Sequence, residues 1–268
     1  MQQDPVLDFQ CVNSLLELRY PFTFIRFSDG EMEVIHNSKL VIEEGSVEWR
    51  GRRNPASYPV FDNKTFLPER DHGFRAALID AARFRSHRYF KGIRTQGDLG
   101  DRDKRRMIEL NGGTTEGLTF SDLLINENWR RFLSITLPLI LERDNVTFIG
   151  NFRARPGLLG SSLGHIEIGD DVIPKYQEVL SEVVPKVNLL PLDSIVLSSA
   201  SSLTNILGQK LSQIRPDITF IDVGTSLNPF IGLEAGKREY HSQILPWSFR
   251  NLKKKALYYL LGSHKMRW

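Results

Sequence analysis

Hydrophobic and polar positions along the chain follow two periods, one typical of buried strands and the other of amphipathic helices. Short runs rich in β-branched and aromatic side chains predict strands at 22–27, 89–93, 146–150, 194–198 and 219–223. Helical spacing of apolar residues predicts helices at 4–19, 68–85, 129–141, 171–184 and 202–214. Glycine and charge dominate two further segments, which predict a hairpin or lid at 44–66 and a surface loop around a short helix at 94–117.

This alternation of strands and helices predicts the fold class. Strands that alternate with helices form a mainly parallel sheet with helices on its faces, because each crossover must return to the same end of the sheet. We therefore expect an α/β protein with a single Rossmann-like domain over 1–246. No internal repeat or low-complexity linker divides this stretch. A basic amphipathic segment, 247–268, follows it.

Composition excludes several classes of protein. The 268 residues are 41% hydrophobic, which suffices for a sizeable core. No apolar run reaches the roughly 20 residues that cross a bilayer, and the N-terminus lacks the pattern of a signal peptide, so we expect a cytoplasmic protein. A net charge of +3 is too small to indicate nucleic-acid binding. Cys11 is the only cysteine, which excludes a disulfide within the chain.

The positive charge is concentrated at the C-terminal end. No acidic residue follows Glu239, and 247–268 combines lysine and arginine with aromatic and aliphatic side chains. Such a segment suits peripheral attachment to the anionic inner face of a plasma membrane. It equally suits a terminal helix packed on the core with a solvated basic side.

The candidate chemistry lies where the first predicted strand ends. Asp29 and Glu31 flank Gly30, which allows a tight turn, and two carboxylates at this spacing can converge on one hard cation. Substrate phosphate oxygens would complete the shell of that cation. Arg26, just upstream, suits a bidentate contact with phosphate or with these carboxylates. The alternative is a surface turn whose acids cap the following helix.

The segment 24–32, Phe-Ile-Arg-Phe-Ser-Asp-Gly-Glu-Met, resembles the strand and turn of GT-D type glycosyltransferases, which carry an Asp-x-Glu motif on one Rossmann-like domain. Segments 122–129, 195–204 and 220–224 are similar to that family in the same order. The chain departs from the family pattern at Ser28, where glycine is usual, and at Thr225, where histidine is usual. The turn 198–204 also lacks the family's Gly-Pro-Thr character.

The resemblance implies a glycosyltransferase that moves a sugar from a nucleotide-diphosphate sugar, a UDP-sugar above all, to a glycan or lipid-linked glycan acceptor. The implied setting is bacterial cell-surface polysaccharide or glycoprotein biosynthesis. Asp29 and Glu31 would be the catalytic residues and would bind Mn²⁺ or Mg²⁺. The implied donor-binding residues are Arg26, Ser28, Gly30, Asn128, Arg153, Ser199, Ser201 and Asp222.

Several of these residues also have a purely structural interpretation. The serine turn at 198–202 opens a helix, so it suits either a diphosphate or ordinary helix capping. Asp222 suits either hydroxyl binding or capping of its own turn. Trp129 suits stacking on a base or sugar, or a place in the core. An inverting reaction requires a general base, and the sequence offers three candidates for it: Asp29, Asp222 and Glu127.

Two other functions compete with the glycosyltransferase. A methyltransferase would use 220–224 as its acidic strand end, but its glycine-rich turn should come first in the sheet, where this chain has 28–31. A non-catalytic membrane-surface module would rest on 247–268 and would leave the Asp-x-Glu turn without a role. The string Gly-Ser-Ser-Leu-Gly at 160–164 matches a hydrolase motif, but Pro156 and Gly157 interrupt the strand that this motif requires.

Overall fold

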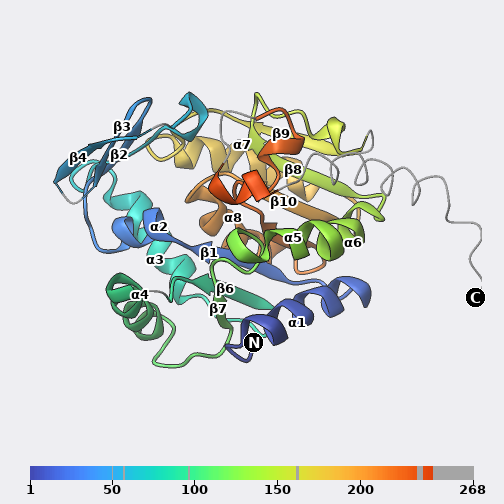
Figure 1. Cartoon of the computed structure of the whole chain (residues 1–268). Helices are drawn as coiled ribbons and strands as arrows, with labels where there is room; N and C mark the ends of the chain where they lie inside the picture. The colour runs from blue at the N-terminus through green and yellow to red at the C-terminus, as the bar shows by residue number, and fades with distance from the viewer. Residues whose placement is uncertain (50, 57, 96, 161–162, 234–237, 244–268) are drawn as a thin grey trace, which may run out of the picture.

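A fully parallel sheet forms the centre of the molecule (Figure 1). The computed structural model describes all residues except 50, 57, 96, 161–162, 234–237 and 244–268. Within them, seven strands pair in the order β7-β6-β1-β11-β10-β8-β9. Their bounds are β1 Thr23–Phe27, β6 Tyr89–Ile93, β7 Leu118–Phe120, β8 Val146–Asn151, β9 Gly164–Ile168, β10 Ile195–Ser199 and β11 Thr219–Asp222. The predicted α/β class with a mainly parallel sheet is confirmed.

Helices cover both faces of this sheet (Figure 1). Successive side chains of β1 point to opposite faces, so Phe24 joins one core cluster while Ile25 and Phe27 join the other. The cluster of Phe24 is closed by α1 Pro5–Glu17, α5 Trp129–Arg131, the π-helical segment η3 Phe132–Thr136 and α6 Leu137–Leu141. The opposite cluster is closed by α2 Asp29–Ile35, α3 His72–Arg83, α4 Gly97–Leu110, α7 Tyr176–Asn188 and α8 Leu203–Ile214.

The order of the strands puts β1 at the point where the chain changes direction. From β1 the chain builds outward through β6 and β7, and it then builds β8 to β11 on the other side. Crossovers on the two sides of such a point diverge, which leaves a crevice at the carboxyl ends of the strands. The turn at 28–31 leaves β1 at that crevice.

A second sheet, antiparallel and smaller, is inserted between α2 and α3. Its strands are β2 Leu40–Glu43, β3 Ser46–Trp49, β4 Arg52–Pro55 and β5 Lys64–Phe66, in the order β4-β3-β2-β5. It stands at one end of the molecule in Figure 1. The segment 44–66 therefore does contain a hairpin, but that hairpin is part of a four-stranded sheet that the sequence did not predict. Gly45 and Gly51 turn the hairpins with φ of +85° and +71°, a conformation that tight hairpins favour.

Other local predictions need correction. The edge strands β7 and β9 were not predicted, because β7 has three residues and β9 carries polar side chains. The helix expected at 171–184 begins only at Tyr176, since Asp171 has a left-handed φ of +43°. The loop expected at 94–117 contains the 14-residue helix α4. Within the described residues, short 3-10 helices are η1 Val60–Asp62, η2 Asn126–Asn128, η4 Pro156–Leu158, η5 Asn228–Phe230 and η7 Glu239–Gln243.

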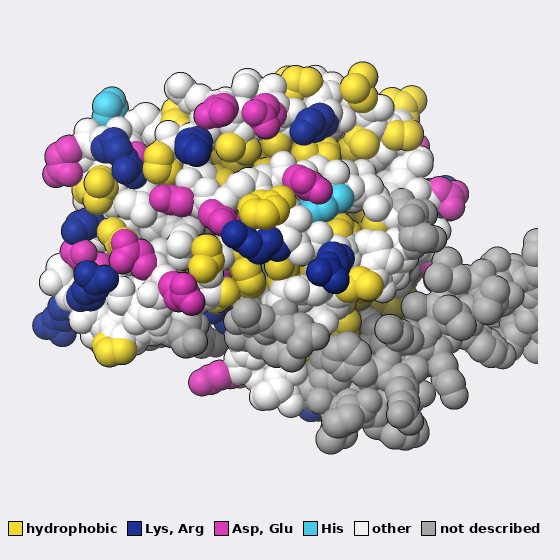
Figure 2. All heavy atoms as spheres, turned by 90° about the horizontal axis from the view of Figure 1, so that it is seen from above, with side chains coloured by type: hydrophobic (Ala, Val, Ile, Leu, Met, Phe, Trp, Pro, Cys, Tyr) yellow, Lys and Arg dark blue, Asp and Glu magenta, His cyan; other side chains and the backbone are white. Residues whose placement is uncertain are grey.

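Neither a membrane span nor a continuous basic face is found in the part of the surface that can be described, which is the described helices and the one face shown in Figure 2. Among the described residues, no helix combines the length and apolarity needed to cross a bilayer. On the face shown in Figure 2, acidic and basic side chains intermingle with hydrophobic ones. The basic segment 247–268 and the predicted domain end at 246 lie outside the described residues, so both stay predictions.

Candidate functional site

A cavity of about 570 Å³ lies at the carboxyl ends of the central strands. Its wall comes from the residues that follow β1, β6, β7, β10 and β11, and from the small sheet at Tyr58 and 61–64. This volume is within the range of pockets that hold small organic ligands. The topology thus brings segments from most of the chain to one hollow.

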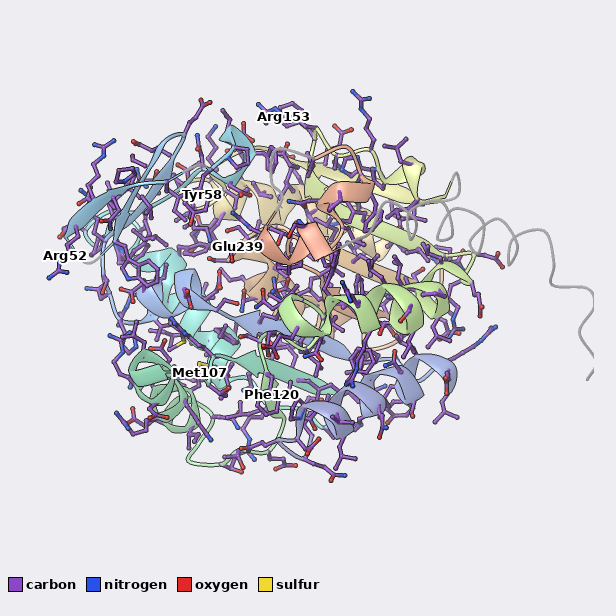
Figure 3. All side chains as sticks on the ribbon, viewed as in Figure 1. Arg52, Tyr58, Met107, Phe120, Arg153 and Glu239 are labelled. Carbon is purple, nitrogen blue, oxygen red and sulfur yellow. The ribbon has the colours of Figure 1, made fainter. Side chains whose placement is uncertain are left out.

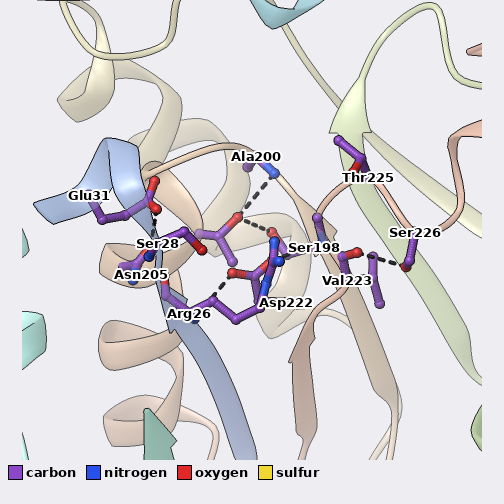
Figure 4. Close-up of polar contacts among 12 residues, drawn as sticks. Arg26, Ser28, Glu31, Ser198, Ala200, Asn205, Asp222, Val223, Thr225 and Ser226 are labelled. Atoms are coloured by element: carbon purple, nitrogen blue, oxygen red, sulfur yellow. Dashed lines mark hydrogen bonds and ion pairs between the residues drawn. The ribbon is translucent and has the colours of Figure 1, made fainter. Parts of the chain in front are cut away.

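The wall at the end of β1 is a capped helix start. Ser28 is the N-cap residue of α2, and its backbone N–H donates to Oε2 of Glu31 at 3.1 Å (Figure 4). A serine followed three residues later by glutamate is the sequence pattern of a capping box. The helix-capping interpretation of Glu31 is therefore part of its structural role.

Glu31 also binds two distant segments. Its Oε1 accepts a hydrogen bond of 2.6 Å from Ser202 Oγ at the start of α8, and lies 3.8 Å from Lys64 Nζ of the small sheet. The side chain is only 10% exposed. Burial pushes the pKa of Glu31 upward, but Lys64, the Ser202 hydroxyl and Arg26 outweigh it and lower the pKa below its usual value. Glu31 is an ionised carboxylate at neutral pH.

Asp29 has a different environment. Its side chain is 49% exposed, and Oδ1 accepts a hydrogen bond of 2.8 Å from Arg94 Nη1, which follows β6. Partial burial raises the pKa of Asp29, and Arg94 opposes that rise. Among the described residues none donates a hydrogen bond to Oδ2. This oxygen can therefore accept a ligand from the cavity.

Arg26 pairs with Asp222 and not with Asp29 or Glu31, contrary to one of the two sequence-based expectations. Its Nη2 lies 3.0 Å from Oδ1 of Asp222, and its backbone N–H donates to Oδ2 at 3.2 Å (Figure 4). Asp222 also accepts from the Gly224 N–H at 2.9 Å, so it caps its own turn while lining the cavity. Burial raises the pKa of Asp222, and Arg26 opposes this.

The serine turn after β10 is ordered by hydroxyl contacts. Thr204 Oγ1 lies 2.9 Å from Ser198 Oγ and accepts from the Ala200 N–H at 3.0 Å. Ser199 and Ser201 line the cavity, and Ser201 has a left-handed φ of +53°. The turn leads directly into α8, whose N-terminal end carries partial positive charge.

The connection between β4 and β5 adds a charged pair to the cavity wall. Arg238 Nη2 lies 2.7 Å from Asp62 Oδ2, and the same guanidinium lies 5.2 Å from the centroid of the Tyr58 ring. Burial raises the pKa of Asp62, with Arg238 and Lys64 opposing the rise. The ion pair thus connects Asp62, ahead of β5, to Arg238, which follows β11 in the chain.

Eight of the ten predicted site residues line this cavity: Arg26, Ser28, Asp29, Gly30, Glu31, Ser199, Ser201 and Asp222. The other two do not. The Asn128 amide instead donates to the Asp122 carbonyl at 3.2 Å. Arg153 pairs with Asp170 at 2.7 Å and lies at the outer edge of the molecule in Figure 3. Tyr58, by contrast, lines the cavity.

Trp129 belongs to the core, which was the structural alternative. Its side chain is fully buried, and its indole N–H donates to the Ser226 carbonyl at 2.9 Å.

Five charged residues of the cavity wall were not predicted from the sequence: Lys64, Arg94, Asp62, Asp122 and Arg238. Arg94 could have been found, because it directly follows a predicted strand.

No protein-family model and no curated protein matches the sequence. A solved structure described as "The highly conserved domain of unknown function 1792 has a distinct glycosyltransferase fold" aligns with a TM-score of 0.51 at 9% identity, over 81% of this chain and 76% of that one. A selenomethionine-substituted structure of the same domain gives a TM-score of 0.49 at 8% identity, over 81% and 77%.

The chain has this glycosyltransferase fold. The alignment covers more than three quarters of both chains, so the likeness concerns the whole architecture and not one βαβ unit. The resemblance seen in the sequence is confirmed at the level of the fold.

Gly224 sets how closely the β11 turn approaches Arg26. Its φ is +48°, and a Cβ at this position would lie 1.9 Å from Arg26 Nη2. We predict that Gly224→Ala displaces the guanidinium from Asp222 and lowers the free energy of unfolding by about 2–4 kcal/mol, which combines backbone strain with a broken buried pair. Gly45→Ala is the matched control, because Gly45 also has a positive φ but nothing within 4 Å. If urea denaturation shows the same loss of unfolding free energy for Gly224→Ala and Gly45→Ala, the prediction is wrong.

Glu31 should stabilise the fold in a pH-dependent way. We predict that Glu31→Gln lowers the free energy of unfolding at pH 7 by about 1–3 kcal/mol. Because the folded-state pKa is lowered, this contribution is present above the usual glutamate pKa and disappears as the pH falls through the folded value. The gap between wild type and variant should therefore narrow below about pH 4.5. Glu44→Gln, on an exposed turn, is the control. A gap that does not depend on pH would refute this role.

Proposed function

We propose that this protein is a glycosyltransferase that takes a sugar from a nucleotide-diphosphate sugar, with UDP as the expected nucleotide. The observation that carries the proposal is the position of the Asp-x-Glu turn. It lies in a cavity at the switch point of a glycosyltransferase fold, beside a hydroxyl-lined helix start.

The charges of the cavity suit a diphosphate. Arg26, Lys64 and Arg94 all line it, and each is paired with a carboxylate that can release it in part to an incoming anion. The Arg26 Nε is buried and has no hydrogen-bond partner among the described residues, so this N–H can donate to a bound anion. Ser199 and Ser201, ahead of α8, add hydroxyls and the positive end of the helix dipole. The bound diphosphate would bridge the β1 and β10 turns.

The carboxylates fit a divalent ion only together with the donor. Among the described residues, no cluster of three or more His, Cys, Asp or Glu side chains could hold a metal. Asp29 has a free oxygen, whereas both oxygens of Glu31 already accept hydrogen bonds. Mg²⁺ commonly binds through one or two carboxylates and completes its shell with phosphate oxygens and water. We therefore assign Asp29 as the main ligand of Mn²⁺ or Mg²⁺, with Glu31 as the second.

Each part of the wall has a role in the transfer. A bound cation would supply stabilisation of the charge that develops on the leaving diphosphate. Arg26, Arg94 and the start of α8 would hold the diphosphate and stabilise the same charge. The small sheet would shield the reacting carbon from water through Tyr58 and the Asp62–Arg238 pair. The acceptor would be a glycan or lipid-linked glycan of the bacterial cell surface, as the family resemblance implies.

Two alternatives rest on weaker observations. A methyltransferase would need a free acidic strand end at 222, but Asp222 is already bound by Arg26 and Gly224. A membrane-surface module would rest on 247–268, which lies outside the described residues. A peripheral membrane contact through that segment remains part of the proposal, as an aid to reaching a lipid-linked acceptor.

Donor binding tests the proposal through thermal stability. We predict that UDP or a UDP-sugar at about 100 times its Kd stabilises the wild type by about 2.7 kcal/mol, a rise in Tm of roughly 5 °C or more, with a larger rise when Mn²⁺ or Mg²⁺ is present. Asp29→Asn should lose the metal-dependent part. Asp80→Asn, an exposed acid on α3, should behave as wild type.

Either of two results would contradict the proposed glycosyltransferase function. One is the absence of any shift with nucleoside diphosphates and their sugars in every metal condition. The other is a shift with S-adenosylmethionine alone, which would favour the methyltransferase.

A further inference from the structure

Among the described residues, five carboxylates line the cavity: Asp29, Glu31, Asp62, Asp122 and Asp222. Four of them have a cationic partner in the same cavity wall. The pairs are Asp29–Arg94 at 2.8 Å, Glu31–Lys64 at 3.8 Å, Asp62–Arg238 at 2.7 Å and Asp222–Arg26 at 3.0 Å. Within the part of the chain that the structure describes, Asp122 forms no such pair, and it is the residue that the proposed donor chemistry does not use.

The backbone around Asp122 is held in place while its side chain remains available. Asp122 follows β7, and its carbonyl accepts hydrogen bonds from the Ile125 N–H and the Asn128 amide, each at 3.2 Å. Ile125 and the neighbouring Asn126 also line the cavity. The turn is therefore anchored through its main chain. Among the described residues no other residue donates a hydrogen bond to the Asp122 carboxylate, so a ligand in the cavity can contact it.

The strand order separates Asp122 from the diphosphate site. In the sheet, β7 is followed by β6, β1, β11 and β10. The serine turn lies at the β10 end of the cavity and Asp122 at the β7 end, with the Asp29 turn of β1 between them. A donor whose diphosphate extends from the β10 turn to the Asp29 turn of β1 would direct its sugar toward β6 and β7, open to attack from the side of Asp122.

The electrostatic surroundings of Asp122 suit proton uptake. Burial raises its pKa, and Glu127 raises it further, while its own backbone N–H and Arg26 oppose the rise. Burial also raises the pKa of Asp29, Asp62 and Asp222, so basicity alone does not single out one residue. Asp122 differs from those three in its lack of an ion pair among the described residues. A proton on any of the other three would leave an arginine without its partner in a partly buried site.

We propose that Asp122 is the general base of the transfer reaction, the group that removes the proton from the attacking acceptor hydroxyl. This inference rests on the proposed function. The acceptor O–H bond breaks and its proton passes to the Asp122 carboxylate, while the acceptor oxygen forms a bond to the anomeric carbon. The bond from that carbon to the diphosphate oxygen breaks, and its electron pair leaves with the nucleoside diphosphate. A single displacement of this kind inverts the anomeric configuration.

Water and azide as acceptors test the assignment without knowledge of the natural acceptor. UDP release from UDP-glucose, UDP-galactose and UDP-N-acetylglucosamine is measured for wild type, Asp122→Asn and Asp80→Asn. Transfer to water needs a base, so Asp122→Asn should lose about 100-fold or more in rate. Azide is an anion that needs no deprotonation, so it should restore UDP release in Asp122→Asn. Donor Kd and Tm should stay at wild-type values, and Asp80→Asn should match wild type throughout.

The outcomes separate this inference from the function on which it rests. Hydrolysis by Asp122→Asn within threefold of wild type, or a loss that azide does not restore, overturns the role as base while donor binding stands. Failure of the wild type to bind any of the three donors overturns the proposed function instead.

A second measurement needs no turnover. In carboxyl-¹³C-aspartate NMR, the resonance that Asp122→Asn removes should titrate above the usual aspartate pKa of about 3.9. Titration at or below that value would also overturn the role.

Discussion

One buried carboxylate joins the three segments on which the cavity depends. Glu31 accepts from its own helix start at Ser28, from Ser202 at the start of α8, and lies beside Lys64 of the small sheet. A buried charge without these partners would be costly, so the turn, the helix and the small sheet must meet at this point for the fold to be stable. The geometry of the site is therefore coupled to the stability of the domain.

The same coupling explains why the two carboxylates of the Asp-x-Glu turn differ. Glu31, at the third position of α2, points into the protein and is held ionised, while Asp29, at the first position, faces the cavity with one oxygen free. A second buried pair, Arg26 with Asp222, fixes the neighbouring turn of β11 and depends on the missing side chain of Gly224. These contacts hold Glu31 and Arg26 in place, and the groups that we propose to act on a ligand are above all Asp29 and Asp122.

Sequence patterns predict the inner strands and the Asp-x-Glu turn because both depend on local information. Buried strands such as β1 are short runs dominated by aromatic and β-branched residues, and the turn is a short motif. The partners of the motif are not local: Ser202 is 171 residues from Glu31, and Asp222 is 196 from Arg26. Asp122 follows a strand of three residues, too short for a periodic signal. Arg153 was misplaced because a strand end alone does not decide which way a side chain turns, and Asp170 holds it outside.

We infer that the hollow between the β1 and β10 turns holds a nucleotide-diphosphate sugar. A crystal structure determined with UDP and Mn²⁺ at saturating concentration would test this inference. We expect electron density for the diphosphate between Arg26 and the serine turn at 199–201, with the metal on Asp29. Density for UDP at any other place on the molecule, or a cavity that stays empty at saturation, would contradict it.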